Sequence, residues 1–211
     1  MNCIHIDRLK ITHAEGTLLD IAFDIHRSLA LVGQSGSGKS LTLKALLGLL
    51  DRSLGLELQK RSDFEWIRGE SVALVPQNPF TALSPLTKIK DQMFFPPERS
   101  GELFDLLGLE RGLLERFPPE LSGGQIQRVA VARALVTNPS LILADEPTGN
   151  LDTKNSEEII YLFKQLNIQG HTIVMVTHES DIAAHAKRVV VLRDGEICED
   201  YTQKQITHSV N

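Results

Sequence analysis

This 211-residue chain contains few of the residues that mark several large classes of protein. Its two cysteines, Cys3 and Cys198, lie far apart and fit no metal-binding spacing. No stretch reaches the roughly 18 consecutive apolar residues of a transmembrane helix. Lys and Arg number 22 against 27 Asp and Glu, so the net charge does not suggest a nucleic-acid surface. We therefore expect two reduced, structural thiols, no disulfide framework, and no nucleic-acid partner.

The N-terminal residues also lack the basic start and apolar middle of a signal peptide. The apolar share of 42% is enough for one large α/β domain, or for a core with a small inserted subdomain. We expect a cytosolic protein whose contact with any membrane goes through a partner.

A glycine-rich stretch carries the strongest local signal. It reads Gly33-Gln-Ser-Gly-Ser-Gly-Lys39-Ser40, and it lies between an apolar run at 29–32 and a helical pattern at 41–50. Glycines let backbone N–H groups turn around an anion, and the positive end of the following helix points at the same place. This order predicts a phosphate-binding loop in which Lys39 reaches the phosphates and Ser40 ligates Mg²⁺. The predicted nucleotide-binding residues are Gly33, Gln34, Ser35, Gly36, Ser37, Gly38, Lys39, Ser40 and Leu41.

Hydrophobic periodicity predicts an α/β fold. The alternating pattern at 19–25 favours an antiparallel strand, whereas residues 51–70 show no clear pattern. Prolines punctuate residues 78 to about 120, which indicates a mostly helical insertion. We predict a mostly parallel sheet flanked by helices, with an antiparallel β subdomain, in a single domain over 1–211 with a helical subdomain at about 78–136. Strands are expected at 4–11, 19–25, 29–32, 71–75, 140–144, 172–176, 189–192 and 196–198, and helices at 41–50, 101–109, 122–136, 152–166 and 179–186.

Two carboxylates follow the apolar strand 140–144. Ligands in open α/β sheets lie at the carboxyl ends of strands. Asp145 can therefore hold Mg²⁺, and Glu146 can accept a proton from a water that attacks the γ-phosphate. Together with the glycine loop, this pair indicates nucleotide hydrolysis.

The stretch Leu121-Ser-Gly-Gly-Gln125 distinguishes this chain from other nucleotide hydrolases. Ser122 is placed to cap a helix whose first N–H groups are exposed by Gly123 and Gly124, which makes a second anion site. Here the chain resembles the ATP-binding cassette (ABC) family, whose signature is LSGGQ. The resemblance implies that Ser122, Gly123, Gly124 and Gln125 cap ATP bound to the glycine loop of a second subunit. It therefore implies a head-to-tail dimer.

Other landmarks of the family follow in order. The resemblance makes Gln77, Glu146 and His178 the catalytic residues, and Ser40, Gln77 and Asp145 the Mg²⁺ site. Residues 149–152, which end at Asp152, match the D-loop, a segment that crosses the dimer interface in this family. His13 takes the place of an aromatic that stacks on adenine, and an imidazole stacks more weakly. The implied ligands are ATP and Mg²⁺, and the implied partners are membrane permease subunits and an identical or different second cassette.

The type of cassette remains open between two resemblances. Residues 76–85 resemble the Q-loop of peptide and nickel importers, while 147–152 and 176–179 resemble the lipoprotein-release and macrolide-efflux type. We favour import, with an extracytoplasmic binding protein and a peripheral position on the cytoplasmic face of the inner membrane. The alternatives are a release, efflux or cell-division ATPase, another mechanical ATPase, and a nucleotide-binding module without hydrolysis.

Overall fold

The computed structural model describes residues 3–94 and 97–203, in two compact units. The first unit comprises Met1–Asp63 and Val174–Asn211, and the second comprises Phe64–Ile173. The predicted single domain over 1–211, with its subdomain at about 78–136, stays a prediction. Among the described residues, no helix has both the length and the apolar character needed to cross a membrane.

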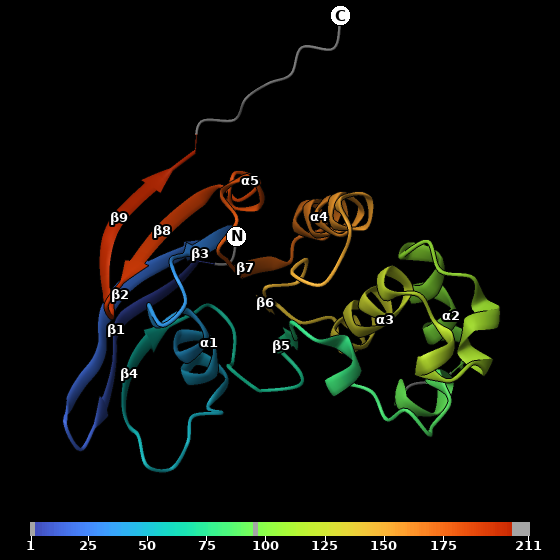
Figure 1. Ribbon diagram of the computed structural model, residues 1–211, viewed down its shortest axis with the longest axis horizontal. Coiled ribbons are helices and arrows are strands. Elements are labelled where there is room, and N and C mark those ends of the chain that lie inside the picture. The colour runs from blue at the N-terminus through green and yellow to red at the C-terminus, as the bar shows by residue number, and fades with distance from the viewer. Residues whose placement is uncertain (1–2, 95–96, 204–211) are drawn as a thin grey trace, which may run out of the picture. The chain divides into compact units, whose positions relative to one another are not determined.

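The first unit contains an antiparallel sheet of three strands in the order β2-β1-β4 (Figure 1). They are β1 (Cys3–His13), β2 (Gly16–His26) and β4 (Gly55–Arg61). The alternating apolar residues of β2 are buried, as the period of two predicts. Strand β4 was not predicted, because its sequence is polar and mostly exposed; it is a strand through its backbone pairing with β1.

A second group of strands in the first unit carries the glycine loop. Strand β3 (Ser28–Val32) runs parallel to β8 (Arg188–Arg193), and β8 turns back antiparallel into β9 (Glu196–Thr202). Helix α1 (Lys39–Leu47) follows the loop and ends at Gly48, which is left-handed, so it is shorter than the predicted 41–50 at its carboxyl end. The short helix α5 (Ser180–Ala183) packs on β3. Strand β7 (Thr172–Thr177) lies where the chain passes from one unit to the other.

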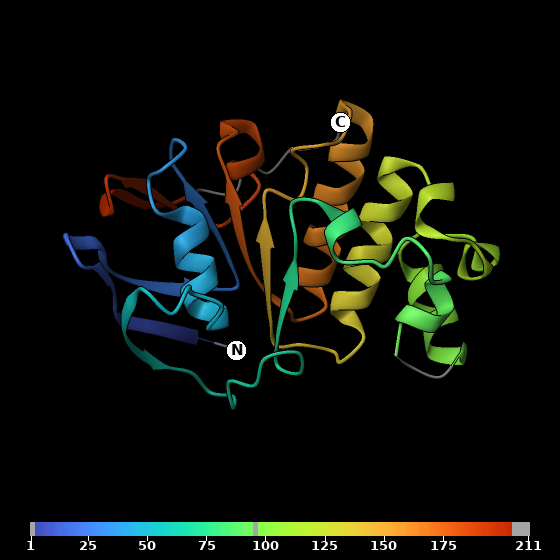
Figure 2. The same ribbon diagram turned by 60° about the horizontal axis from the view of Figure 1, so that its bottom comes forward.

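The second unit has two parallel strands, β5 (Val72–Val75) and β6 (Leu141–Asp145). Helix α3 (Gly123–Leu135) packs on β5 and contacts both α2 (Pro97–Leu106) and α4 (Thr153–Ile168), and Figure 2 shows α3 beside both α4 and β5. Helix α2 ends earlier than predicted, because Gly108 is left-handed and closes the helix. Short 3-10 turns connect these elements at 79–81, 89–92, 111–115 and 118–120.

Candidate functional site

The glycine loop lies between β3 and α1 in the first unit, and its glycines are required by backbone conformation and packing. Gly36 and Gly38 have positive φ angles of 84° and 106°, which residues with a side chain rarely adopt. A Cβ at Gly33 would lie 2.4 Å from the carbonyl oxygen of Leu192, so this position requires glycine. All the predicted phosphate-binding residues, from Gly33 to Leu41, lie in this loop and the first turn of α1.

Lys39 folds back over the loop that precedes it. Its Nζ donates to the carbonyl oxygens of Gly33 at 2.6 Å and Gln34 at 2.9 Å, and the residue is only 5% exposed. The loop is therefore lined by an ammonium group and the N-terminal end of α1, which both favour an anion. The role of these residues in nucleotide binding stays a prediction.

The turn between β8 and β9 contacts this loop. Gly195 N donates to the carbonyl oxygen of Ser37 at 3.3 Å, and a Cβ on Gly195 would lie 2.1 Å from the carbonyl oxygen of Leu18. The sequence predicts the turn at Asp194 and Gly195, but not its contacts with Ser37 and Leu18, which lie far earlier in the chain. Gly195 is thus a supporting residue that sequence reasoning missed.

Two further predicted residues of the first unit lie next to strand ends. His13 is exposed at the last position of β1, where it pairs with Gly16 across the hairpin turn. His178 is exposed and directly follows β7. Their predicted contacts with adenine and the γ-phosphate stay predictions.

The second unit brings Gln77 and Glu146 together. Val75 of β5 pairs in register with Ala144 of β6, and each of the two polar residues lies two positions beyond this pair. Gln77 Nε2 donates to Glu146 Oε2 at 2.9 Å. Glu146 has a φ of 41°, an uncommon conformation for a residue with a side chain. Asp145, the last residue of β6, is half-buried beside this pair in the chain. Parallel strands in register thus explain why residues far apart in sequence meet.

The predicted signature begins helix α3. Ser122 Oγ accepts from Gln125 N at 3.3 Å, and Gln125 Oε1 accepts from Ser122 N at 3.0 Å, so the two form a capping box. A Cβ on Gly124 would lie 2.1 Å from Asn155 Oδ1, whereas one on Gly123 would make only an ordinary contact. The glycines therefore allow close packing of α3 on α4, and they leave the helix start open.

Asp152 connects the D-loop to helix α4. Its Oδ1 accepts from Asn155 N at 2.9 Å, and its Oδ2 accepts from Asn155 Nδ2 at 2.6 Å. The backbone N–H of Asn155, followed by its side chain, lowers the pKa of the Asp152 carboxyl below its usual range. Since Asn155 also contacts the position of Gly124, the signature and the D-loop are held together within this unit.

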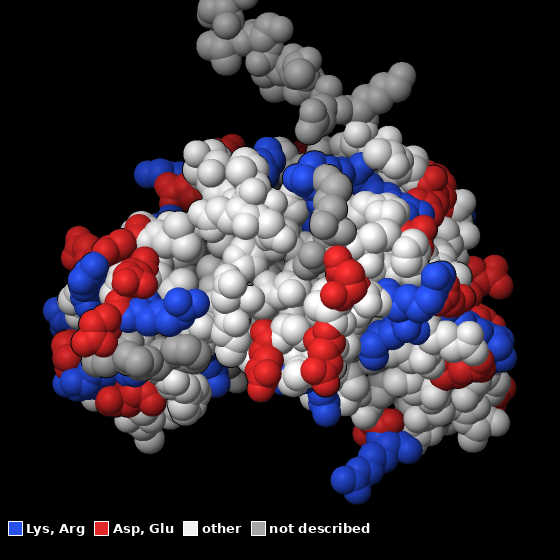
Figure 3. Space-filling model, turned by 180° about the vertical axis from the view of Figure 1, so that it is seen from behind, with Lys and Arg blue, Asp and Glu red and all other residues white. Residues whose placement is uncertain are grey.

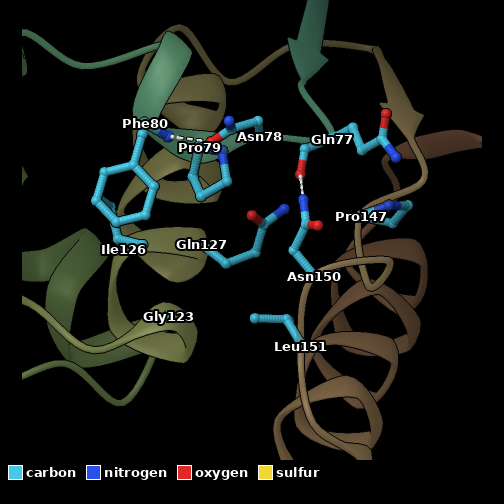
Figure 4. A pocket seen from close by; sticks show the side chains of 10 residues that line it. All are labelled: Gln77, Asn78, Pro79, Phe80, Gly123, Ile126, Gln127, Pro147, Asn150 and Leu151. Atoms are coloured by element: carbon cyan, nitrogen blue, oxygen red, sulfur yellow. Dashed lines mark hydrogen bonds between the residues drawn. The ribbon is translucent and has the colours of Figure 1, made fainter.

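A pocket of about 200 Å³ lies between the Q-loop, α3 and the D-loop (Figure 4). Asn150 Nδ2 donates to the carbonyl oxygen of Gln77 at 3.2 Å across it. Sequence reasoning assigned roles to Gln77 and Gly123, but it assigned none to Gln127, two residues after the signature, or to Asn150, although Asn150 lies inside the D-loop stretch 149–152. The lining residues are Gln77, Asn78, Pro79, Phe80, Gly123, Ile126, Gln127, Pro147, Asn150 and Leu151.

Charged side chains on the surface are mixed in sign. On the face in Figure 3, Lys and Arg side chains lie among Asp and Glu side chains. Ion pairs such as Arg8–Asp20, Arg61–Asp7 and Arg188–Asp200 contribute to this mixture. The expected absence of a nucleic-acid partner stays a prediction. The described residues hold no group of three or more His, Cys, Asp or Glu side chains placed for a metal, and the predicted Mg²⁺ site at Ser40, Gln77 and Asp145 stays a prediction.

A glycine loop between a buried strand and a helix, in a chain with carboxylates after another buried strand, defines a P-loop NTPase. The profile of the family described as "ABC transporter" matches residues 18–149. The chain therefore belongs to the ABC transporter family, as an ATP-binding cassette with ATPase chemistry.

Known proteins support this placement over nearly the whole chain. An uncharacterized ABC transporter ATP-binding protein, YvrO of Bacillus subtilis, is 44% identical over 82% of this chain and 82% of its own length. The macrolide export ATP-binding/permease protein MacB of Chlorobaculum tepidum is 47% identical over 82% of this chain, but over only 29% of its own length. The chain thus spans about a third of the MacB relatives.

Solved structures confirm the predicted fold class. The dimeric bacterial ABC transporter cassette MJ0796 matches with a TM-score of 0.78 and 31% identity, over 96% of this chain and 99% of that one. A dimeric post-hydrolysis state of the same cassette, bound to ADP and Pi, has a TM-score of 0.78 and 30% identity over 97% of this chain and 99% of that one. Dimerisation and the bound products are properties of those structures.

The predicted import function is wrong. The similar proteins named above include macrolide export proteins, and none of them is named as a peptide or nickel importer. The import hypothesis rested on ten residues, 76–85, whereas these matches cover 82% or more of the chain. The binding protein expected with import loses its support as well. The residues at 147–152 and 176–179, which resembled the efflux type, were the better guide.

Proposed function

We propose that this chain is the ATP-hydrolysing part of an export-type ABC complex, and that it drives a membrane permease from the cytoplasmic face. The observation that carries this proposal is its 47% identity to the ATP-binding part of a macrolide export protein. YvrO, of which the chain covers 82%, is named as an ABC transporter ATP-binding protein, which supports the role of an ATP-binding cassette.

In this mechanism, two cassettes close on two ATP molecules. Lys39 and the N-terminal end of α1 bind the phosphates on one side, and Ser122 and Gly124 of a second cassette bind them on the other. Ser40 and Asp145 would hold Mg²⁺, which would neutralise phosphate charge when bound. Glu146 accepts a proton from the water whose oxygen bonds to the γ-phosphorus, and Gln77 orients that carboxylate through their hydrogen bond. The bond between the γ-phosphorus and the oxygen that bridges it to the β-phosphate breaks, ADP leaves with that oxygen, and the γ-phosphate leaves as free phosphate.

Three exposed apolar side chains support a permease contact on the 80–94 surface, defined by Phe80, Leu86 and Phe94. Leu86 is 88% exposed at the end of a turn that the buried Gln92 holds by three hydrogen bonds, to Ser84 N, Ser84 O and Thr87 O. Arg133 of α3 donates to the carbonyl oxygen of Ala82 and lies 5.5 Å above the Phe94 ring. Because Arg133 belongs to α3, these contacts connect the signature helix to the 80–94 surface.

A macrolide-sensitivity experiment tests the export direction. We expect deletion of this gene to lower the macrolide concentration that stops growth, and the wild-type gene to restore it. Glu146→Gln should not restore it, because that variant keeps the fold but loses the proton acceptor. The control is that the purified cassette hydrolyses ATP. If it does, and deletion of the gene leaves macrolide sensitivity unchanged, macrolide export is rejected and release of another cargo is the next hypothesis.

A further inference from the structure

Gln127 of helix α3 has an unusual environment for a polar residue. It is 1% exposed, and its side-chain nitrogen Nε2 is buried with no hydrogen-bond partner among the described residues. Buried amide donors in folded proteins are almost always paired, and an unpaired one reduces stability. This donor therefore calls for an acceptor in another state of the protein.

The acceptor has to come from the wall of the pocket, because Gln127 Nε2 is sealed from solvent. Figure 4 shows Gln127 projecting from α3 toward Asn150, while the Gln77 side chain is directed away. Asn78 Oδ1 already accepts from Phe80 N at 3.0 Å. Asn150 Nδ2 donates to the carbonyl oxygen of Gln77, which leaves Asn150 Oδ1 as the acceptor for Gln127 Nε2.

We propose that Gln127 is a positioning residue for ATP hydrolysis, whose amide donates to Asn150 Oδ1 when the cassette closes on ATP. The resulting chain of amides runs from Gln127 through Asn150 to the carbonyl oxygen of Gln77. It joins the signature helix to the D-loop and to the residue that contacts Glu146. The inference rests on the proposed catalytic role of Glu146.

The neighbouring contacts determine which part moves. Helix α3 is tied to α4 by the ion pair between Arg128 and Glu158 and by the close approach of Gly124 to Asn155. Asn150 is exposed and precedes α4, so the segment that carries it can shift toward Gln127 while Asn150 Nδ2 stays on the carbonyl oxygen of Gln77.

Kinetics of matched variants test the proposal. Gln127→Leu removes the donor at similar volume, and Asn150→Ala removes the acceptor. Each should lower kcat for MgATP about fivefold, the scale of one lost hydrogen bond, with KM within about twofold. The double variant should fall no further than either single variant. Gln169→Leu, an exposed glutamine at the carboxyl end of α4, should leave kcat unchanged.

Two outcomes overturn the proposal: kcat of Gln127→Leu within twofold of wild type, or additive losses in the double variant. The melting temperature should stay unchanged or rise in Gln127→Leu, because an unpaired donor is removed; a purely structural role predicts a fall. If that variant does not fold, Gln127→Met takes its place, since it is unbranched and similar in length to glutamine but has no donor.

A crystal structure of Glu146→Gln with MgATP gives an answer that does not depend on hydrolysis. We expect Gln127 Nε2 within hydrogen-bond distance of Asn150 Oδ1, and any other partner, or none, contradicts the inference. A wild-type chain that binds ATP without hydrolysing it would instead refute the proposed function, while this structure still decides the hydrogen bond.

Discussion

Glu146 shows how a single residue combines chemistry with backbone strain. Its φ of 41° aims its carboxylate at Gln77, and this conformation disfavours any residue with a Cβ. The apolar strand that precedes Asp145 and Glu146, together with the glycine loop, predicts that Glu146 lies at a strand end beside a nucleotide. The left-handed turn was not predictable, because nothing in Asp145-Glu146-Pro147 requires it.

This strain predicts a difference between two variants that both lack the carboxylate. Glu146→Gly should be more stable than Glu146→Ala by about 1 kcal/mol, because glycine adopts a positive φ without steric cost. Urea unfolding of the two proteins measures the difference. Equal stabilities would show that the turn is relaxed, and both variants should be inactive in ATP hydrolysis.

At the scale of elements, most boundaries were predicted from apolar periodicity and capping residues. Ser122 and Asp152 both precede a helix as N-caps, as their positions predict. Strand β4 was missed because its residues are polar and mostly exposed, and only its pairing with β1 makes it a strand. Pairing between distant segments is a tertiary property that local patterns do not contain.

The cap of helix α4 leads to a prediction that depends on pH. Asp152→Ala should lower the melting temperature by a few degrees, whereas Asp152→Asn keeps an acceptor and should lower it less. The folded pKa of Asp152 is lowered, so its ionised form stabilises the protein at neutral pH. That contribution is lost as pH falls through the lowered pKa. The advantage of wild type over Asp152→Asn should therefore shrink on acidification in thermal melts, and a constant difference would contradict this.

At the scale of the whole molecule, the direction of transport was the part that the sequence reasoning got wrong. A cassette contacts its permease rather than the cargo, so the direction leaves only indirect marks on this chain. The Q-loop resemblance and the D-loop resemblance pointed to opposite directions. The similarity to the relatives named above covers 82% of the chain, whereas the import hypothesis rested on ten residues, so the similarity decides against import.

A mixing experiment tests whether each ATP site is shared between two chains. Lys39→Ala loses the phosphate-binding ammonium but keeps its signature. Gly123→Asp keeps its glycine loop and places a carboxylate where the γ-phosphate of the other chain would lie; the site tolerates a Cβ, whose nearest neighbour is Leu151 Cδ2 at 3.7 Å. Each variant alone should be inactive.

An equal mixture of these two variants should recover about a quarter of the wild-type ATPase rate. Half of the dimers are then mixed, and each mixed dimer has one complete site out of two. The rate should be followed against total protein concentration, with each variant mixed with itself as the control. No recovery at any concentration would show either that the sites are not shared or that one site alone cannot turn over.

The capping box at Ser122 has a consequence for how mutants of this signature are interpreted. The Ser122 hydroxyl oxygen accepts a hydrogen bond from Gln125 N, and the hydroxyl proton of Ser122 remains available to donate to a ligand. One oxygen atom can therefore hold the helix start and offer a proton to a phosphate at the same time. Loss of activity in Ser122→Ala would then mix a folding defect with a binding defect, while threonine is the replacement that retains both abilities.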